Sequence, residues 1–237
     1  MSDHQKEAFQ RLQAEYCLPV PEKIDTEASV LDWDVVFPHR LRVPGRPVIL
    51  DIGFGMGYEL AELAEQWQDN DFLGIEVHKP GVGKLLSEVE QRSLNNVRVI
   101  RYDAVPVCRT LIPRETVRGI HIFFPDPWPK KRHHKRRLVR PGFPELIAPL
   151  LQPDGYVYLV TDWEDYAMQM IRVLDESPLL RNRFPTEEGF APSLPWRPQT
   201  AFERKGLGKG HQIFELVYER ARKEKKSGAS VTDTPDA

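Results

Sequence analysis

Four acidic residues stand at or near the ends of short apolar runs, where a folded chain could use them for chemistry. They are Asp51, Glu76, Asp103 and Asp126. Three glycines follow the first acid within "DIGFGMG", and they are Gly53, Gly55 and Gly57. Glycine lets a backbone turn tightly and approach a ligand where a side chain would collide. Glycines and carboxylates together therefore predict a binding site for a ligand that contains a nucleoside.

The spacing of these residues discriminates between two kinds of ligand. A dinucleotide site has the pattern Gly-x-Gly-x-x-Gly, whereas this chain has Gly-x-Gly-x-Gly with Asp51 just ahead of it. A carboxylate there would repel a pyrophosphate but would suit an ammonium or a sulfonium, and S-adenosylmethionine carries both. Glu76 would then accept from the ribose hydroxyls, and Asp103 from the adenine amino group. Alternatively, the four acids are ordinary turn or cap residues, which is the weaker explanation for four acids at one edge.

A dense run of positive charge follows Asp126 directly, within "FPDPWPKKRHHKRR" (124–137). Seven cations fall within eleven positions, although the formal net charge of the chain is only −2: Lys130, Lys131, Arg132, Lys135, Arg136, Arg137 and Arg140. A charge run of this kind is usually a solvated face. Its position after a Pro-Trp-Pro joint and a strand-like stretch instead favours a surface that binds a polyanion such as a nucleic acid.

Alternating apolar strands and amphipathic helices are the elements that must position these residues. Apolar runs rich in β-branched and aromatic residues predict strands at 47–53, 71–78, 96–103, 119–126, 155–162 and 212–221. Helical spacing predicts helices at 5–17, 58–67, 83–94, 143–152 and 165–177. This alternation is typical of a doubly wound α/β fold, with a mostly parallel sheet and helices on both faces. In such a sheet the four acids end consecutive strands on the edge where ligands bind.

The length and composition predict one main domain with appendages. The chain has 237 residues, of which 41% are hydrophobic, as in ordinary globular proteins. We expect a helical and irregular lead-in over 1–46, the main domain over 47–221 and a disordered polar tail over 222–237. No apolar run approaches the roughly 20 residues of a membrane span. The two distant cysteines favour reduced thiols in a cytoplasmic protein, no metal-binding spacing is present, and nothing requires a partner subunit.

Several separated blocks resemble the tRNA (guanine-N7-)-methyltransferases, a branch of the class I S-adenosylmethionine-dependent enzymes. The blocks are "DIGFGMG", "GIEVHKPGV", "NVRVIRYDA", "IFFPDPWPKKRHHKRR", "TDWEDYA", "RPQTAFERKG" and "GHQIFEL", and they span roughly residues 47–220. The fourth block is highly specific, whereas the glycine loop alone would be weak. The resemblance implies a seven-stranded sheet whose last strand is antiparallel. It also implies methyl transfer from S-adenosylmethionine to N7 of a tRNA guanine, expected in the variable loop.

The resemblance also assigns roles to individual residues. The cofactor residues match the glycines of the loop with Asp51, Glu76, Asp103 and Asp126, and Asp126 matches the residue usually assigned as catalytic. The tRNA and guanine contacts match Lys130, Arg132, Lys135, Arg136, Arg137, Asp162, Thr200, Phe202 and Glu203. Two features depart from the family pattern. Asp51 stands where a glutamate is common, and the N-terminal segment does not match the basic leader of many members.

The chemistry of N7 methylation limits what Asp126 can do. Guanine N7 has a free lone pair and no proton, so its attack on a methyl group needs no general base. We therefore expect the Asp126 carboxylate to stabilise the positive charge that develops on the purine, and to accept from its N1–H and amino groups. Trp128 and Phe202 either stack on the exposed base or simply pack beneath their loops. Glu203 could read the Watson–Crick edge of the guanine.

Three other functions remain open at the level of the sequence. A class I methyltransferase that acts on a small molecule or a protein would use the cofactor acids, but it would leave the cationic run without a role. A non-catalytic RNA-binding module would use the cations but would need no cofactor. A nicotinamide oxidoreductase fits least well, because the acid-flanked loop lacks the third glycine in register.

Overall fold

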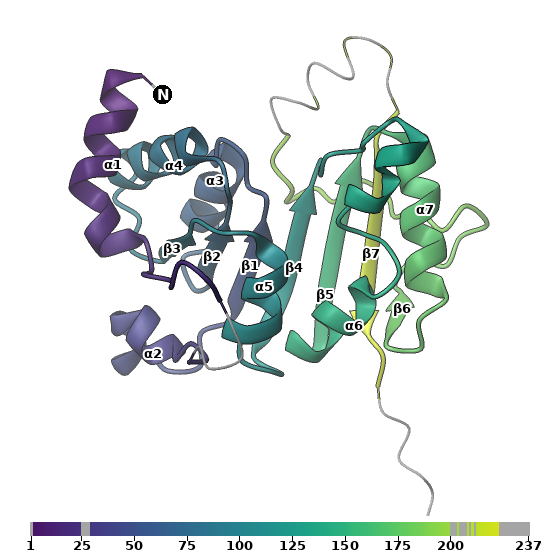
Figure 1. Ribbon diagram of the computed structural model, residues 1–237. Coiled ribbons are helices and arrows are strands. Elements are labelled where there is room, and N and C mark those ends of the chain that lie inside the picture. Colours follow the sequence, from purple (N-terminus) through teal and green to yellow (C-terminus); the bar gives the residue numbers. More distant parts are fainter. Residues whose placement is uncertain are drawn as a thin grey trace, which may run out of the picture.

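A seven-stranded sheet runs through the middle of the protein (Figure 1). The computed structural model describes residues 2–24, 29–199, 203, 208, 210 and 212–222, so the predicted tail lies outside them except for Arg222. The strand order is β3-β2-β1-β4-β5-β7-β6, in which β7 runs antiparallel to both neighbours and the other pairs are parallel. The strands are β1 Val48–Ile52, β2 Asp71–Ile75, β3 Val97–Ile100, β4 Val117–Phe123, β5 Leu151–Thr161, β6 Leu180–Asn182 and β7 Phe214–Arg220. The predicted doubly wound sheet with an antiparallel last strand is confirmed.

The inner strands are apolar on both faces because other elements cover both sides of the sheet. Along β1, Val48, Leu50 and Ile52 belong to one core cluster, whereas Ile49 belongs to another. Alternate side chains of a strand point to opposite faces, so the two clusters lie on opposite sides of the sheet. A sheet that is covered twice needs continuous apolar strands rather than alternating ones, which is the pattern that the sequence shows.

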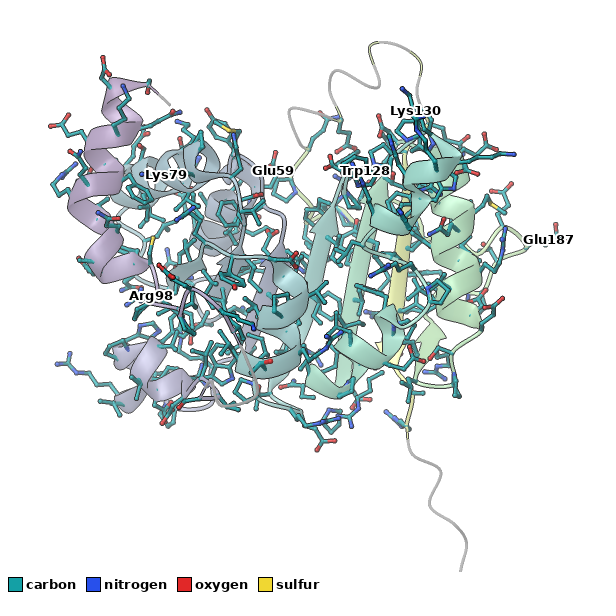
Figure 2. The ribbon with its side chains drawn as sticks, viewed as in Figure 1. Glu59, Lys79, Arg98, Trp128, Lys130 and Glu187 are labelled. Carbon is teal, nitrogen blue, oxygen red and sulfur yellow. The ribbon has the colours of Figure 1, made fainter. Side chains whose placement is uncertain are left out.

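Helices flank the sheet along its length. They are α1 Asp3–Tyr16, α2 Trp33–Val36, α3 Tyr58–Gln66, α4 Lys79–Gln91, α5 Ala104–Pro106, α6 Phe143–Ile147 and α7 Glu164–Asp175, with short turns η1 Pro38–Leu41, η2 Val107–Leu111, η3 Lys131–Arg136 and η4 Ala148–Leu150. On the outer side α1 lies along α4, where Lys79 Nζ is 4.7 Å from the centre of the Phe9 ring (Figure 2). Within the described residues, no helix is both long enough and apolar enough to cross a bilayer.

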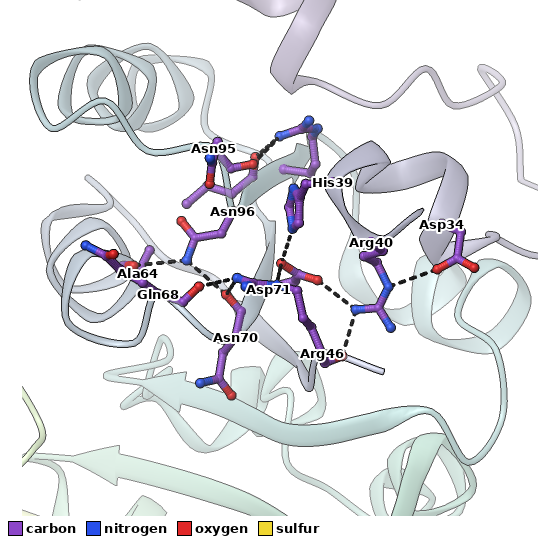
Figure 3. Close-up of polar contacts among 12 residues, drawn as sticks. Asp34, His39, Arg40, Arg46, Ala64, Gln68, Asn70, Asp71, Asn95 and Asn96 are labelled. Carbon is purple, nitrogen blue, oxygen red and sulfur yellow. Dashed lines mark hydrogen bonds and ion pairs between the residues drawn. The ribbon is translucent and has the colours of Figure 1, made fainter. Parts of the chain in front are cut away.

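The segment before β1 is tied to the amino end of β2 by a buried carboxylate (Figure 3). The Asp71 side chain is fully buried, and it accepts from Arg40 Nη1 at 2.7 Å and from Arg46 Nε at 3.0 Å. Earlier in the chain, Cys17 forms a parallel bridge with Val99 in β3. The lead-in is therefore held against the sheet at two separate places.

Three elements differ from the sequence prediction. The helix expected over 83–94 begins earlier, at Lys79. Pro80 lies in its first turn, where a proline is compatible with a helix, so the proline does not mark a break before the helix. The helix expected over 143–152 is shorter, since β5 already begins at Leu151. Strand β6 has three residues, too few to show an alternating pattern, and its pairing with β7 depends on contacts that the local sequence does not reveal.

Candidate active site at the carboxyl edge of the sheet

The glycine loop after β1 leaves its backbone open at the carboxyl edge of the sheet. Gly53, Gly55 and Gly57 all have positive φ, at 75°, 59° and 75°, a region that favours glycine. A Cβ added at Gly53 or Gly55 would meet nothing within 4 Å, whereas one at Gly57 would lie 2.6 Å from Leu85 Cβ. The first two glycines therefore present bare backbone to a ligand, and the third allows α3 and α4 to pack closely.

Glu76, just after β2, is fixed by backbone donors. Its Oε2 accepts from Gly55 N at 2.9 Å, and its Oε1 accepts from Val77 N at 2.7 Å and from His78 N at 2.8 Å. Each carboxylate oxygen offers about two acceptor positions, so these bonds orient the group and leave one position, on Oε2, for a hydroxyl of a ligand. The glycine loop and the end of β2 thus form one preorganised wall, compatible with the predicted ribose contact.

Asp51 lies just before the glycine loop and is only 3% exposed. Burial, followed by the charges of Glu59 and Glu76, raises the pKa of its carboxyl well above the usual range. No hydrogen bond from the described residues offsets this effect. A cation bound here would stabilise the ionised carboxylate. The residues present therefore fit a ligand that carries an ammonium or a sulfonium, as S-adenosylmethionine does.

Asp103 follows β3 and has an exposed side chain. Its carboxyl accepts from Val105 N at 2.8 Å and so acts as the N-cap of α5. The capping bond engages Oδ1 of Asp103. The contact between the carboxyl and an adenine amino group stays a prediction.

Asp126 lies just past β4, in a turn with an unusual backbone. Phe124 and Trp128 on either side of it have φ of 52° and 45°, a region that costs non-glycine residues of order 1–3 kcal/mol each. The Asp126 side chain is exposed, and no cation among the described residues forms an ion pair with it. Because β4 runs parallel to β1, the turn places this exposed carboxylate at the edge that carries the glycine loop.

The run of positive charge from Lys130 to Arg140, called the basic segment below, has its exposed cations at this same end of the sheet. Figure 2 shows Trp128 and Lys130 at the end where Glu59 lies. The predicted tRNA contacts that are exposed are Lys130, Arg132, Lys135 and Arg136. The Arg136 guanidinium is 4.9 Å from the centre of the Trp128 ring, and the half-buried indole also packs edge-on against His133 at 5.8 Å. One side of the Trp128 ring is thus already covered by its own loop.

Arg137 departs from the prediction for the basic segment. Its side chain is 1% exposed, and its hydrogen bonds go to groups of the protein, on Pro127, Asp165 and Gln169. An enclosed guanidinium has no surface to offer a phosphate. Arg137 is thus placed differently from the exposed cations, and its contact with tRNA stays a prediction.

Glu203 is also buried, with 6% of its surface exposed. Its two oxygens accept from Arg197 at 2.6 and 2.8 Å, and Arg197 also donates to Glu215 in β7 at 2.8 Å. These contacts direct the carboxylate towards Arg197, and the reading of a guanine edge by Glu203 stays a prediction. Neither the burial nor the pairing is visible in the sequence, where the block looks like an ordinary loop.

The remaining predicted substrate contacts are placed only in part. Asp162 follows β5 at the carboxyl edge and is half-buried. Thr200 and Phe202 lie outside the described residues. The structure therefore brings Asp162 and the four exposed cations to the end of the sheet that carries Asp126.

Two residues at this edge were not found from the sequence. Glu59, in the first turn of α3, is close enough to Asp51 for its charge to raise the pKa of that carboxyl. In the sequence Glu59 looks like any acid in the first turn of a helix, where negative charge is common. Val77 is 62% exposed directly after Glu76, so an apolar side chain faces solvent at the edge that carries the glycine loop. Because apolar residues next to a strand are expected to be buried, sequence reasoning passed over it.

Sequence comparison finds relatives over nearly the whole chain. The family described as "Putative methyltransferase" matches residues 45–216. A tRNA (guanine-N(7)-)-methyltransferase of Bordetella pertussis is 43% identical over 224 residues, which cover 93% of this chain and 82% of the relative. The protein of the same name from Ralstonia nicotianae is 45% identical over 219 residues, which cover 92% of this chain and 82% of the relative.

Solved structures share the fold at much lower identity. The 16S rRNA methyltransferase KamB is 17% identical with a TM-score of 0.54, and the match covers 80% of this chain and 94% of KamB. A SAM-dependent methyltransferase from Aquifex aeolicus is 17% identical with a TM-score of 0.50, covering 78% of this chain and 94% of the other. These similarities show the fold alone. The sequence relatives show more, and the protein belongs to the tRNA (guanine-N(7)-)-methyltransferase family.

Proposed function

We propose that the protein transfers a methyl group from S-adenosylmethionine to N7 of a guanine in tRNA, which gives 7-methylguanosine and S-adenosylhomocysteine. The observation that carries the proposal is the segment after β4, where the exposed carboxylate of Asp126, at the edge that carries the glycine loop, is followed directly by exposed cations. A methyltransferase for small molecules or proteins has no need of those cations. An RNA-binding module has no need of the glycine loop and the buried Asp51. The names of the sequence relatives support the same reaction.

The chain's own residues divide the work of holding the methyl donor. S-adenosylmethionine supplies an activated methyl group when bound. Asp51 offsets the positive charge of the donor, and bare backbone at Gly53 and Gly55 allows its close approach. Glu76 is already oriented by three backbone N–H groups, so it binds a hydroxyl without losing further side-chain freedom.

Asp126 serves the base rather than the methyl donor. Guanine N7 attacks with its own lone pair, so no proton has to be removed. The purine becomes positively charged as the new bond forms, and the exposed carboxylate of Asp126 stabilises that charge and accepts from the N1–H and amino groups. Positioning supplies much of the remaining rate, because the reaction needs only collinear alignment of nucleophile, methyl and sulfur.

The exposed cations serve the rest of the tRNA. Lys130, Arg132, Lys135 and Arg136 project from η3 and its N-cap into solvent, where they can bind backbone phosphates with salt-dependent affinity. By family resemblance, the target guanine lies in the variable loop. We also place the protein in the cytoplasm, since the thiols of Cys17 and Cys108 are free, as in a reducing compartment.

Nucleoside mass spectrometry tests the reaction. The protein is incubated with S-adenosylmethionine and unmodified tRNA, and the tRNA is digested to nucleosides, among which 7-methylguanosine should appear. Asp126→Asn should lower kcat by roughly 10²- to 10³-fold, because one group that stabilises transition-state charge is lost, with tRNA affinity unchanged. Asp154→Asn is the matched control, since Asp154 is an exposed aspartate near the amino end of β5, away from the edge that carries Asp126.

Two results would refute the proposal or part of it. Methyl transfer into proteins or small molecules, with none into tRNA, would exclude the tRNA reaction. Turnover of Asp126→Asn equal to that of Asp154→Asn would leave the reaction intact but remove the role of Asp126.

A further inference from the structure

Arg137 differs from every other cation of the basic segment in its burial. The cations from Lys130 to Arg140 are otherwise exposed, whereas the Arg137 side chain is 1% exposed. A buried charge is stable only where it is paired and hydrogen-bonded. The partners of Arg137 therefore show what its position requires.

Three of these partners lie on helix α7. Arg137 Nη2 donates to Asp165 Oδ2 at 2.6 Å, and Nη1 donates to Gln169 Oε1 at 2.7 Å. The guanidinium also lies 4.8 Å from the centre of the Tyr166 ring. The hydrogen bond from Arg137 lowers the pKa of the Asp165 carboxyl, so the charge of Arg137 is already matched within the protein.

The fourth partner is in the turn after β4. Arg137 Nε donates to Pro127 O at 2.8 Å, and Pro127 stands between Asp126 and Trp128. The guanidinium therefore fixes the peptide that joins the carboxylate to the indole, and it connects that peptide to α7. A side chain with several donors in a rigid plane can hold separate acceptors in one geometry, which a lysine cannot do.

The chain on the other side of Arg137 is held by the same helix. Val139 N donates to Tyr166 OH at 3.0 Å, and Gln169 Nε2 donates to Val139 O at 2.8 Å. The backbone that follows Arg137 is therefore fixed to helix α7 as well. An unusual backbone such as that of Trp128, with φ of 45°, persists only where its surroundings determine it, and the bond to Pro127 supplies such a constraint.

From this geometry we infer that Arg137 is a positioning residue, which sets Asp126 and Trp128 at the carboxyl edge without touching the tRNA. The inference rests on the proposed function, because Asp126 is assigned its role there. Phosphate binding then belongs to the exposed neighbours, of which Arg136 is the adjacent one. Two consecutive arginines thus have separable effects, on kcat and on the salt dependence of tRNA binding.

Arg137→Lys and Arg136→Gln measure this separation. In Arg137→Lys, kcat should fall roughly 10- to 100-fold, the scale of a misplacement of about 1 Å. In Arg137→Gln, which also removes the charge, the slope of log Kd for tRNA against log salt should equal that of the wild type. In Arg136→Gln, the slope should fall by about one unit, with a smaller effect on kcat. Each kcat is expressed per site that binds S-adenosylhomocysteine, so that loss of folded protein does not count as loss of turnover.

Gln169→Leu covers the case in which Arg137→Lys does not fold. It removes one acceptor of the guanidinium and leaves every cation in place, so kcat should fall several-fold with an unchanged salt slope. A wild-type kcat in a folded Arg137→Lys, or in Gln169→Leu, overturns the inference, as does a lowered salt slope in Arg137→Gln. Absence of 7-methylguanosine with the wild-type protein is a different result, which refutes the proposed function instead.

Discussion

Arg197→Met removes one guanidinium that faces two buried carboxylates. Arg197 is 8% exposed, Glu203 accepts from it through both oxygens at 2.6 and 2.8 Å, and Glu215 accepts at 2.8 Å. Tyr158 OH donates to the other oxygen of Glu215. Glu203 is therefore connected to β7 and β5 through Arg197, and the substitution breaks that connection at its centre.

The expected loss follows from burial. Removing one partner of a buried ion pair costs about 3–5 kcal/mol, and here two carboxylates, 6% and 4% exposed, lose the same partner. At roughly 2–4 °C per kcal/mol for a chain of this length, the Tm should fall by roughly 6–20 °C. Glu203→Gln should cost less, about 1.5–3 kcal/mol, because it removes hydrogen bonds to a charged group while Arg197 keeps Glu215.

Urea unfolding of both variants measures these losses. Arg181→Met is the matched control, since Arg181 is 74% exposed in its 3.2 Å pair with Glu219, and it should change the free energy of unfolding by less than about 1 kcal/mol. The tRNA KM adds a functional readout. If Glu203 acts through Arg197, Arg197→Met and Glu203→Gln should raise the KM for tRNA by similar factors. If Glu203 instead contacts the guanine directly, only Glu203→Gln should raise it. An Arg197→Met variant as stable as Arg181→Met would refute the reasoning.

Two further predictions concern the donor site. Gly81→Ala should weaken S-adenosylmethionine binding and destabilise the protein by about 1–3 kcal/mol, because its Cβ would lie 2.0 Å from Gly55 O; calorimetry showing wild-type affinity would contradict this. S-adenosylmethionine affinity should decrease as the pH falls, since the bound cation favours ionised Asp51, whose pKa burial raises in the free protein. Asp51→Asn should flatten that dependence, and S-adenosylhomocysteine, which lacks the sulfonium charge, should show less of it with the wild type. An unchanged pH dependence in Asp51→Asn would exclude Asp51 as the cause.

The parts of the site that the sequence predicted are those whose signals are local. Gly53 and Asp51 belong to one short segment, in which an apolar strand runs into a glycine turn, and Glu76 ends the next strand. Parallel pairing then brings such strand ends together without any further information, as the register of β1 with β2 shows. A periodic pattern and a fold class were therefore enough to place these residues at one edge.

Burial of charged side chains could not be predicted in this way. Arg136 and Arg137 are consecutive and chemically identical, and only the helix α7, about 30 residues later, makes one exposed and the other buried. Glu203 likewise looks like a loop acid until Arg197 and Glu215 are seen beside it. Their surroundings come from distant segments, and a run of like residues gives no period from which to infer a face.

The same distant contacts explain how an acid can head a basic segment without being neutralised by it. Asp126 precedes the cations closely in sequence, yet no cation among the described residues pairs with it. Arg137 donates a hydrogen bond to the carbonyl of Pro127 and forms an ion pair with Asp165. Arg136 lies over the ring of Trp128. A carboxylate already paired with a guanidinium would stabilise a cationic purine less, since its field would be compensated. Holding the acid and the cations apart therefore lets one short segment bind a polyanion and stabilise a positive charge side by side.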